Sequence, residues 1–350
     1  KWYGGYYGGT WPHGWLSIGD AVVSAYQNAS LLNRNPGEMD VPRSQMEMLA
    51  SKGKLHDGTW KVPYKYGDPG EYRYDLWIED VIVTPDGRIV WEDGWFEFQP
   101  MDARYPVHLW NITAEEADRR LILRLRNGCK RDWERVIRYG NRENGNKKDL
   151  GGHEAAWFAY LNGEFPDYPE QILRCNLSQV YERTQLMLHD TQDPLTYTDS
   201  YLQMRNPVTV EGLVQLTMGA PLPLYNGGLL HARVRYYDAQ GGRPGLPADV
   251  AALVEGMDAE SVTLQLVNLH PTSLREVVVQ AGAFGEHLFT SASYRDRGCH
   301  ADGEQRSMRI DAPCFTVRLE PGSLIRLQLG MQRYACDPSH HPAWSRAGAC

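Results

Sequence analysis

Carboxylates and histidines that could act as acids and bases gather in three segments of the N-terminal half of the chain. The candidate catalytic residues are Glu97, Asp102, His13, His153 and Glu154. Glycoside hydrolysis requires two carboxyl groups, about 5 to 5.5 Å apart in a retaining enzyme and about 6.5 to 9.5 Å apart in an inverting one. We expect Glu97 to pair with Asp102 or with Glu154. The corresponding chemistry is hydrolysis of a polysaccharide or oligosaccharide.

Aromatic side chains accompany these acids and bases. The first residues, KWYGGYYGGTWPHGW (1–15), combine tyrosines and tryptophans with five glycines. Aromatic rings stack on the apolar faces of sugars, and glycines let backbone N–H groups approach a ligand closely. The expected substrate-binding residues are Tyr6, Tyr7, Trp11, Trp15, Trp60, Tyr66, Tyr72, Trp95 and Arg104.

Two other functions fit the same residues. A lyase acting by β-elimination on a uronate would use Arg104 for the carboxylate, His13 or His153 as the base, and Tyr72 or Tyr74 as the acid. A non-catalytic carbohydrate-binding or structural module, part of a longer protein, would use the aromatic rings alone. We favour the hydrolase because these segments hold more carboxylates than paired Tyr and Arg residues.

Each candidate also has a purely structural interpretation. The aromatic stretch 1–15 would then pack between helices, because glycine allows close approach of neighbouring elements. His13 and His153 would only bond a helix N-terminus, and the acids would be solvated loop charges. The arrangement of the secondary-structure elements decides between these interpretations.

The N-terminal half has helical periodicity. Apolar residues recur every three to four positions, and caps and glycines mark the ends. The predicted helices cover 15–32, 40–53, 113–128, 130–140, 151–163 and 167–190, with a further one starting near Arg104. Long helices joined by short turns pack antiparallel, so helical hairpins are expected.

After residue 205 the pattern changes to period two with β-branched residues, which predicts an antiparallel β-sandwich. The candidate strands lie in 209–219, 229–238, 261–270, 275–285, 287–295 and 314–330. The insert 241–259 is expected to be a Pro/Gly loop with a short helix. The fold class is therefore α+β with two domains: 1–205 helical, 206–335 a β-sandwich, and 336–350 a tail containing Cys and His.

A long aromatic and acidic segment, 54–102, interrupts the helical half. Long loops on a rigid scaffold usually carry function. Within it, VIVTPDGRIVWEDGWFEF (81–98) alternates in polarity and turns at Pro-Asp-Gly, which predicts a small β-hairpin.

Helical hairpins followed by a β-domain, with a glycine-rich aromatic loop such as YYGGTWPHGW (6–15) leading into a helix, resemble the (α/α)-toroid plus β-sandwich proteins among polysaccharide lyases and glycoside hydrolases. The resemblance implies that substrate binds around the N-terminal ends of the inner helices. The segments 6–15, 60–104 and 149–154 would then meet in one cleft. A complete toroid needs more helices than this chain supplies, so further N-terminal helices from the same or another chain are expected.

Composition narrows the possible partners. The chain has 36 Lys and Arg against 44 Asp and Glu, a net charge of −8 with no basic run, which argues against a nucleic acid. No apolar run approaches the roughly 20 residues that span a bilayer. Nucleotide-binding glycine loops, G-x-S-x-G and H-E-x-x-H are absent from the sequence. We therefore expect no cofactor and no membrane partner.

The six cysteines leave three possibilities open. Four lie near the C-terminus, at 299, 314, 336 and 350, and they could form disulfides. With His300, His340 and His341 they could bind a metal, or they could be thiols without a function. The compartment in which the protein acts stays undetermined, and we favour a secreted or periplasmic location. If the tail is ordered, we expect a disulfide that links Cys336 or Cys350 to Cys299, to Cys314 or to each other.

Overall fold

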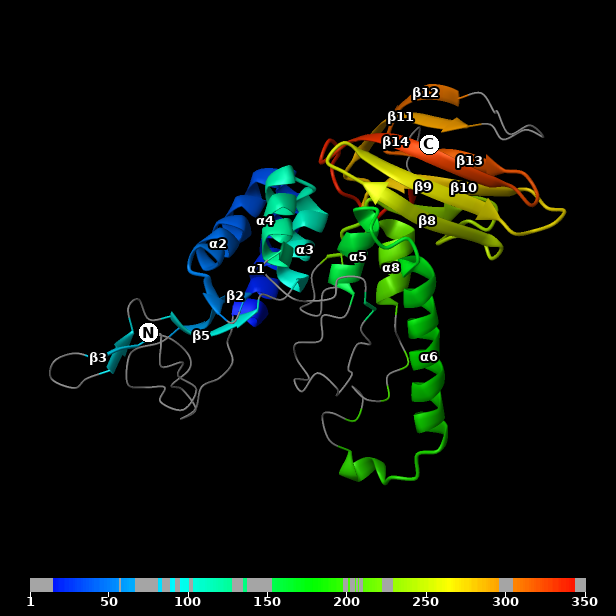
Figure 1. Cartoon of the computed structure of the whole chain (residues 1–350). Helices are drawn as coiled ribbons and strands as arrows, with labels where there is room; N and C mark the ends of the chain where they lie inside the picture. The colour runs from blue at the N-terminus through cyan, green and yellow to red at the C-terminus, as the bar shows by residue number, and fades with distance from the viewer. Residues whose placement is uncertain are drawn as a thin grey trace.

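The fold is α+β, with helices mainly in the N-terminal part and strands mainly in the C-terminal part (Figure 1). The computed structural model describes residues 15–56, 58–66, 81–83, 89–91, 95–100, 103–127, 135–136, 153–197, 201, 205, 207, 210–221, 229–295 and 305–343. The two parts are the two domains that the change of periodicity predicts.

The helices follow the predicted pattern closely. They are α1 (Trp15–Asn33), α2 (Asp40–Ser51), α3 (Arg104–Thr113), α4 (Glu116–Asn127), α5 (Glu154–Leu161), α6 (Tyr168–Leu188) and α8 (Glu211–Met218). The predictions for α1 to α6 are confirmed. The helix predicted at 130–140 lies outside the described residues, apart from 135–136.

The helices form two layers that differ in burial. Residues 105–113 of α3 and 154–159 of α5 are buried on every side. In contrast, α4 buries only a stripe that includes Leu121, Ile122 and Leu125. Helix α3 contacts both α1 and α5, so α3 and α5 are inner helices and α4 is an outer one. A helix that is apolar all round is stable only when it is surrounded in this way.

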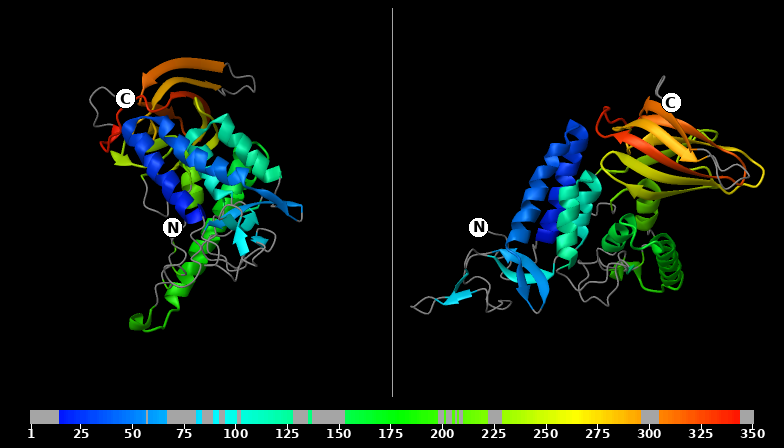
Figure 2. Two further views of the ribbon diagram at one scale, coloured as in Figure 1. Left: turned by 90° about the vertical axis from the view of Figure 1, so that its left-hand side faces the viewer. Right: turned by 45° about the horizontal axis from the view of Figure 1, so that its top comes forward.

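The inner helices point the same way. Near the C-terminal end of α1, Asn28 Oδ1 accepts a hydrogen bond from the Leu229 N–H at 3.0 Å. Near the end of α5, the Tyr160 hydroxyl donates to the Val254 carbonyl at 3.2 Å. The C-terminal ends of these helices therefore meet the β-domain, and their N-terminal ends lie away from it (Figures 1 and 2).

The C-terminal part contains two antiparallel sheets, as predicted. One has the strand order β13-β10-β6-β7 and the other β12-β11-β14-β9-β8. The strands are β6 (Val234–Asp238), β7 (Arg243–Pro244), β8 (Val250–Met257), β9 (Ser261–Asn268), β10 (Arg275–Ala281), β11 (Leu288–Arg295), β12 (Gln305–Ala312), β13 (Cys314–Leu319) and β14 (Leu324–Gln332). In the described part of 260–335 there is no helix.

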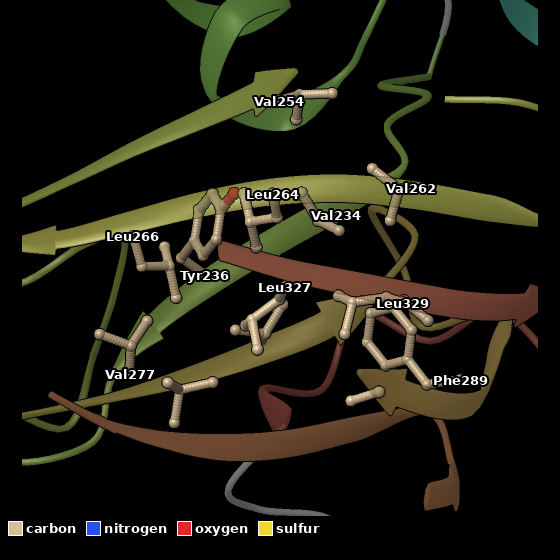
Figure 3. Close-up of a cluster of buried hydrophobic side chains, with 14 of the residues drawn as sticks. Val234, Tyr236, Val254, Val262, Leu264, Leu266, Val277, Phe289, Leu327 and Leu329 are labelled. Carbon is tan, nitrogen blue, oxygen red and sulfur yellow. The ribbon is translucent and has the colours of Figure 1, made fainter. Parts of the chain in front are cut away.

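The two sheets share one apolar core, shown in Figure 3. Along β9, burial alternates strictly, and Val262, Leu264 and Leu266 are fully buried. Tyr236 of the first sheet and Phe289 of the second lie in the same cluster. Burial of each such side chain stabilises the fold by about 1.5 to 3 kcal/mol, so the alternation in the sequence determines which face of each strand is internal.

The strand predicted at 209–219 is wrong. Residues 209–219, predicted as a strand, include helix α8, in which Gln215 and Leu216 are buried against the other helices. A Cβ atom on Gly212 would lie 2.4 Å from Ile172 Cγ1, so α8 and α6 pack closely at this glycine. The boundary at residue 205 stays a prediction, since α8 contacts both α6 and β8.

The prediction of a loop with a short helix at 241–259 is also wrong. This segment contains β7 and β8, and β8 pairs antiparallel with β9 from Val250 to Met257, with a register shift between Val254 and Gly256. Ala and Leu favour a helix here, but pairing with β9 buries Val250 and Val254 in the sandwich core. Tertiary packing therefore overrides the local preference.

The interrupting segment 54–102 contains short strands. β3 (Val81–Val83) and β4 (Ile89–Trp91) pair antiparallel and confirm the predicted hairpin. β1 (Lys54–His56), β2 (Thr59–Tyr66) and β5 (Trp95–Pro100) form a second small sheet in the order β1-β2-β5. Strand β5 is followed closely by α3, so this sheet lies at the N-terminal end of an inner helix (Figure 1).

Backbone hydrogen bonds hold the described part of the tail, residues 336–343, against the sandwich. The Cys336 N–H donates to the Glu286 carbonyl at 3.1 Å, and the Ser339 N–H donates to the Phe284 carbonyl at 2.9 Å. Cys314 is disulfide-bonded. Cys336 forms no disulfide within the described residues. A disulfide from Cys350 to Cys299 or Cys314 stays a prediction, because Cys299 and Cys350 lie outside the described residues. Within the described residues, no group of three or more metal-binding side chains exists.

A buried ion cluster joins the two outer helices α2 and α4. The Arg43 guanidinium donates from Nε and Nη2 to the two Asp118 carboxylate oxygens at 2.8 and 3.0 Å. The Thr113 hydroxyl donates to the same carboxylate at 2.5 Å, and the Asp118 side chain is only 1% exposed. Arg43 therefore neutralises a carboxylate that water cannot reach.

We predict that Arg43→Met lowers the free energy of unfolding by about 3 to 5 kcal/mol, because Asp118 would remain buried without its cation. Urea denaturation followed by circular dichroism measures the loss. The control is Arg174→Met, which removes an exposed pair with Glu170 on α6 and should cost less than about 1 kcal/mol. Equal losses in the two variants would contradict the assigned role of the cluster.

Candidate functional site

The first residues of α5 carry two of the predicted catalytic side chains. His153 is the N-cap residue and is 2% exposed, and Glu154 begins the helix and is 3% exposed. Glu154 Oε2 accepts a hydrogen bond from the His153 backbone N–H at 3.1 Å. A carboxylate at this position interacts favourably with the positive end of the helix dipole.

The imidazole of His153 is buried. Neither ring nitrogen has a hydrogen-bond partner within the part of the chain that the structure describes. Burial lowers the pKa of His153 to about 4, so the ring is neutral near pH 7. A buried polar group without a partner typically costs about 1 to 3 kcal/mol. Such a cost is often found where a side chain is kept ready for a ligand.

An aromatic cluster surrounds the start of α5. Trp157 lies 5.7 Å from the Tyr160 ring and 6.0 Å from the Tyr168 ring, measured between centroids. Burial raises the pKa of Tyr168 well above its ordinary value, and Glu154 raises it further. The Trp157 indole N–H donates to Asn111 Oδ1 of α3 at 2.8 Å. These contacts hold α5 rigidly against α3.

The other predicted site residues are described only in part. For Trp15, Tyr66, Trp95, Glu97 and Arg104 the structure describes the backbone, at the start of α1, in β2, in β5 and at the start of α3. Outside the described residues lie Tyr6, Tyr7, Trp11, His13, Tyr72 and Asp102. Convergence of these residues with His153 and Glu154 stays a prediction.

Trp60 of β2 has a packing role. Its ring packs against the cluster of buried residues between α1 and α4. A Cβ atom on Gly53 would lie 2.4 Å from this ring, so the glycine is required beneath it. Contact with a sugar stays a prediction for this residue.

A second candidate site lies where the helices meet the β-sandwich. It is a recess of about 250 Å³, including solvent at its mouth. The charged and titratable side chains that line it are His231, Arg233, Glu286, His287 and Arg333. Asn111 and Ile112 of α3 and Gly219 after α8 complete the helical wall.

Strand pairing brings these side chains to one end of the sandwich. His231 and Arg233 precede β6, Glu286 and His287 precede β11, and Arg333 follows β14. Leu288 at the start of β11 pairs with Gln332 at the end of β14. In the other sheet, Val234 at the start of β6 pairs with Ala281 at the end of β10. The residues flanking these pairs therefore lie together at the end that faces the helices.

Two arginines bond the C-terminal end of α3. Arg333 Nη1 donates to the Thr113 carbonyl at 2.6 Å, and Nη2 donates to the Ile112 carbonyl. Arg233 Nη2 donates to the Asn111 carbonyl at 3.2 Å. The last carbonyls of a helix have no partner within the helix, and its C-terminal end favours cations. The sandwich thus supplies both the hydrogen bonds and the charge that this helix end needs.

Glu286 is a buried carboxyl held in a tight turn. It is 1% exposed, and its Oε2 accepts the Phe284 N–H at 2.8 Å. Gly282, with φ +87°, lies beneath it, and a Cβ atom there would come within 2.3 Å of the carboxyl group. Burial raises the pKa of Glu286 to about 7. This group therefore changes charge near neutral pH.

The two histidines of the recess are neutral. His287 Nδ1 accepts the Tyr334 N–H at 3.0 Å, so the proton of the neutral ring is on Nε2, which lies 3.7 Å from Glu286 Oε1. Burial lowers the pKa of His287 well below its ordinary value. Burial also lowers the pKa of His231 to about 3, with smaller effects from His108 and Arg333.

Sequence reasoning missed this recess. Its signal is the placing of titratable residues directly outside predicted strands, in His231-Ala-Arg233, Glu286-His287 and Arg333-Tyr334. Such residues lie together only if their strands pair in the right order and register. The alternation of polar and apolar residues in each strand does not specify the order of the strands in a sheet.

Comparison with known proteins places the chain in a family. A family model described as a domain of unknown function, DUF8034, matches residues 1–214. The chain belongs to the DUF8034 family. The matched residues contain α1 to α6, and therefore His153 and Glu154, and end within α8 before the sandwich. No curated protein and no solved structure matches the chain.

We predict that Glu286 makes the stability depend on pH. Its folded pKa of about 7 lies above the ordinary value of 4.5, so its stabilising effect is complete below pH 4.5 and is lost as the pH rises through 7. Glu286→Gln mimics the protonated side chain. Relative to the unsubstituted protein, this variant should gain about 2.5 kcal/mol between pH 5 and pH 8, measured by urea denaturation at each pH.

The matched control is Glu320→Gln, which changes an exposed carboxyl in the same domain. Its stability relative to the unsubstituted protein should not change over the same pH range. If the difference in free energy of unfolding between Glu286→Gln and the unsubstituted protein is also the same at every pH, Glu286 does not titrate in this range.

Proposed function

We propose that this chain is a carbohydrate-active protein that hydrolyses glycosidic bonds in a polysaccharide or oligosaccharide, with Glu154 as one of the two carboxylates. The observation that carries the proposal is the buried pair His153 and Glu154 at the N-terminal end of an inner helix. A carboxyl group and an imidazole are both removed from water there, and the imidazole has no partner among the described residues.

The polarity of the helices supports this location. Helices α1 and α5 have their C-terminal ends at the sandwich, and Arg233 and Arg333 bond the C-terminal end of α3 there. The N-terminal ends of all three therefore face away from the sandwich. In the proposed partial α/α toroid this end is the substrate cleft, and residues before α1, α3 and α5 would line it.

Glu154 would supply one of the two carboxyl groups. It is 3% exposed, and its Oε2 accepts a backbone N–H at the start of α5. In the proposed reaction it would act as the nucleophile or the base. The acid would come from Glu97 or Asp102 on the segment before α3. His153 would bond a sugar hydroxyl, since its neutral ring offers one donor and one acceptor.

The pKa of His153 distinguishes hydrolysis from β-elimination. A lyase that used His153 as its base would need a ring that binds a proton near neutral pH. Burial lowers the pKa of this ring to about 4, which makes it a weak base. Hydrolysis by carboxylates is therefore the better proposal for this pair. The net charge of −8 argues against a nucleic acid substrate, and no helix among the described residues is long and apolar enough to cross a bilayer.

We predict that the purified chain releases reducing ends from at least one member of a panel of neutral and uronate-containing polysaccharides. Glu154→Gln should lower the rate by about 10² to 10⁴-fold while binding on a glycan array is retained, because the amide keeps the shape and cannot exchange a proton. Glu170→Gln, on the exposed face of α6, is the control and should keep full activity.

Three outcomes would overturn the proposal in different ways. Products with an unsaturated uronate, detected by ultraviolet absorbance, would indicate a lyase. Binding to glycans without any turnover would indicate a non-catalytic module. Full activity of Glu154→Gln would remove Glu154 from the chemistry.

A further inference from the structure

The recess between the helices and the sandwich contains buried polar atoms for which the described residues supply no hydrogen-bond partner. Arg233 Nε, Arg333 Nε and His231 Nε2 have no hydrogen-bond partner within the described residues. Arg233 is 3% exposed and His231 is 6% exposed, and all three residues line the same recess. Arginine carries a proton on Nε at every physiological pH. At least two N–H groups in this recess therefore have no acceptor among the residues that the structure describes.

The recess also holds an excess of positive charge. Two guanidinium groups face one carboxyl group, Glu286, which is only partly ionised near pH 7. Burial, and after it the neighbouring Arg333, lowers the pKa of Arg233 to about 9. The carbonyl end of a helix compensates only about half a charge. Positive charge without a full counterion is costly in a buried place.

We propose that this recess binds a small oxyanion of the carboxylate or phosphate class. The oxygens would accept hydrogen bonds from Arg233 Nε and Arg333 Nε, and His231 would contribute its Nε2–H as the ring tautomer allows. Arginine is the side chain best suited to such recognition, because its planar donors match these oxygens.

The arginines are positioned before any ligand arrives. Their Nη atoms are held by the carbonyls of Asn111, Ile112 and Thr113, so each guanidinium has a fixed plane. Fixed donors lower the entropic cost of binding. A metal ion does not fit, because guanidinium groups would repel it and the described residues contain no metal-binding cluster.

The proposed site is separate from the one at the start of α5. It lies at the C-terminal ends of the inner helices, whereas His153 and Glu154 lie at the N-terminal end of α5. Its walls come from both domains, so a bound anion would bridge them. Binding to the folded state alone would raise the stability of the domain junction.

The experiment is titration of the purified full chain with inorganic phosphate, and separately with acetate, at constant ionic strength in a buffer without other oxyanions. Isothermal calorimetry and thermal unfolding should show saturable binding at one site per chain for at least one of the two. The probe that binds more tightly identifies phosphate or carboxylate as the natural class. Arg233→Met should weaken binding about tenfold or more.

Arg309→Gln, on the exposed edge strand β12, is the control and should bind as the unsubstituted protein does. If Arg233→Met fails to fold, His231→Phe is the test variant, because it keeps a ring of similar size and removes the Nε2–H donor. The affinity of this variant for the anion should also be lower than that of the unsubstituted protein. The proposal is overturned if neither anion binds to the unsubstituted protein, or if binding is unchanged in the folded recess variant. Because no glycan is involved, this outcome is independent of whether the chain hydrolyses polysaccharides.

Discussion

The structure depends on the hydrogen bonds that the last backbone carbonyls of α3 accept from two arginines. Arg233 and Arg333 donate to the carbonyls of Asn111, Ile112 and Thr113, which no residue of the helix itself can bond. Both arginines flank strands of the sandwich, so the hydrogen bonds that complete α3 also join the two domains. Because α3 is buried on every side and contacts α1 and α5, its position determines theirs.

One consequence is that the two ends of the inner helices are surrounded by different kinds of side chains. The C-terminal ends meet arginines, neutral histidines and a carboxyl group with a pKa near 7. At the N-terminal end of α5, a carboxylate lies beside an uncharged imidazole and an aromatic cluster. The helix dipole favours the cations at the C-terminal ends. The proposed catalytic residues and the proposed anion site therefore lie at opposite ends of the inner helices.

Much of this arrangement follows from periodicity. The helices α1 to α6 and the alternating burial of β9 were predictable, because a wrong period would expose apolar side chains to water. Residues 209–219 and 241–259 were assigned wrongly. In α8, Gly212 and Gln215 are buried by α6 and its neighbours, and in β8, Val250 and Val254 are buried by pairing with β9. Both segments have mixed local preferences, and their partners come from distant parts of the chain.

The sequence by itself determined the α+β class, the order of the helices and most strands, and the candidate pair His153 and Glu154 at a helix start. These features depend on neighbours within a few positions, where spacing and side-chain type are sufficient. Only the tertiary structure decided that His231, Arg233, Glu286, His287 and Arg333 share one recess. Their meeting depends on strand order and register across about 100 positions of sequence, and on burial, which makes Glu286 a titrating group and leaves the histidines neutral.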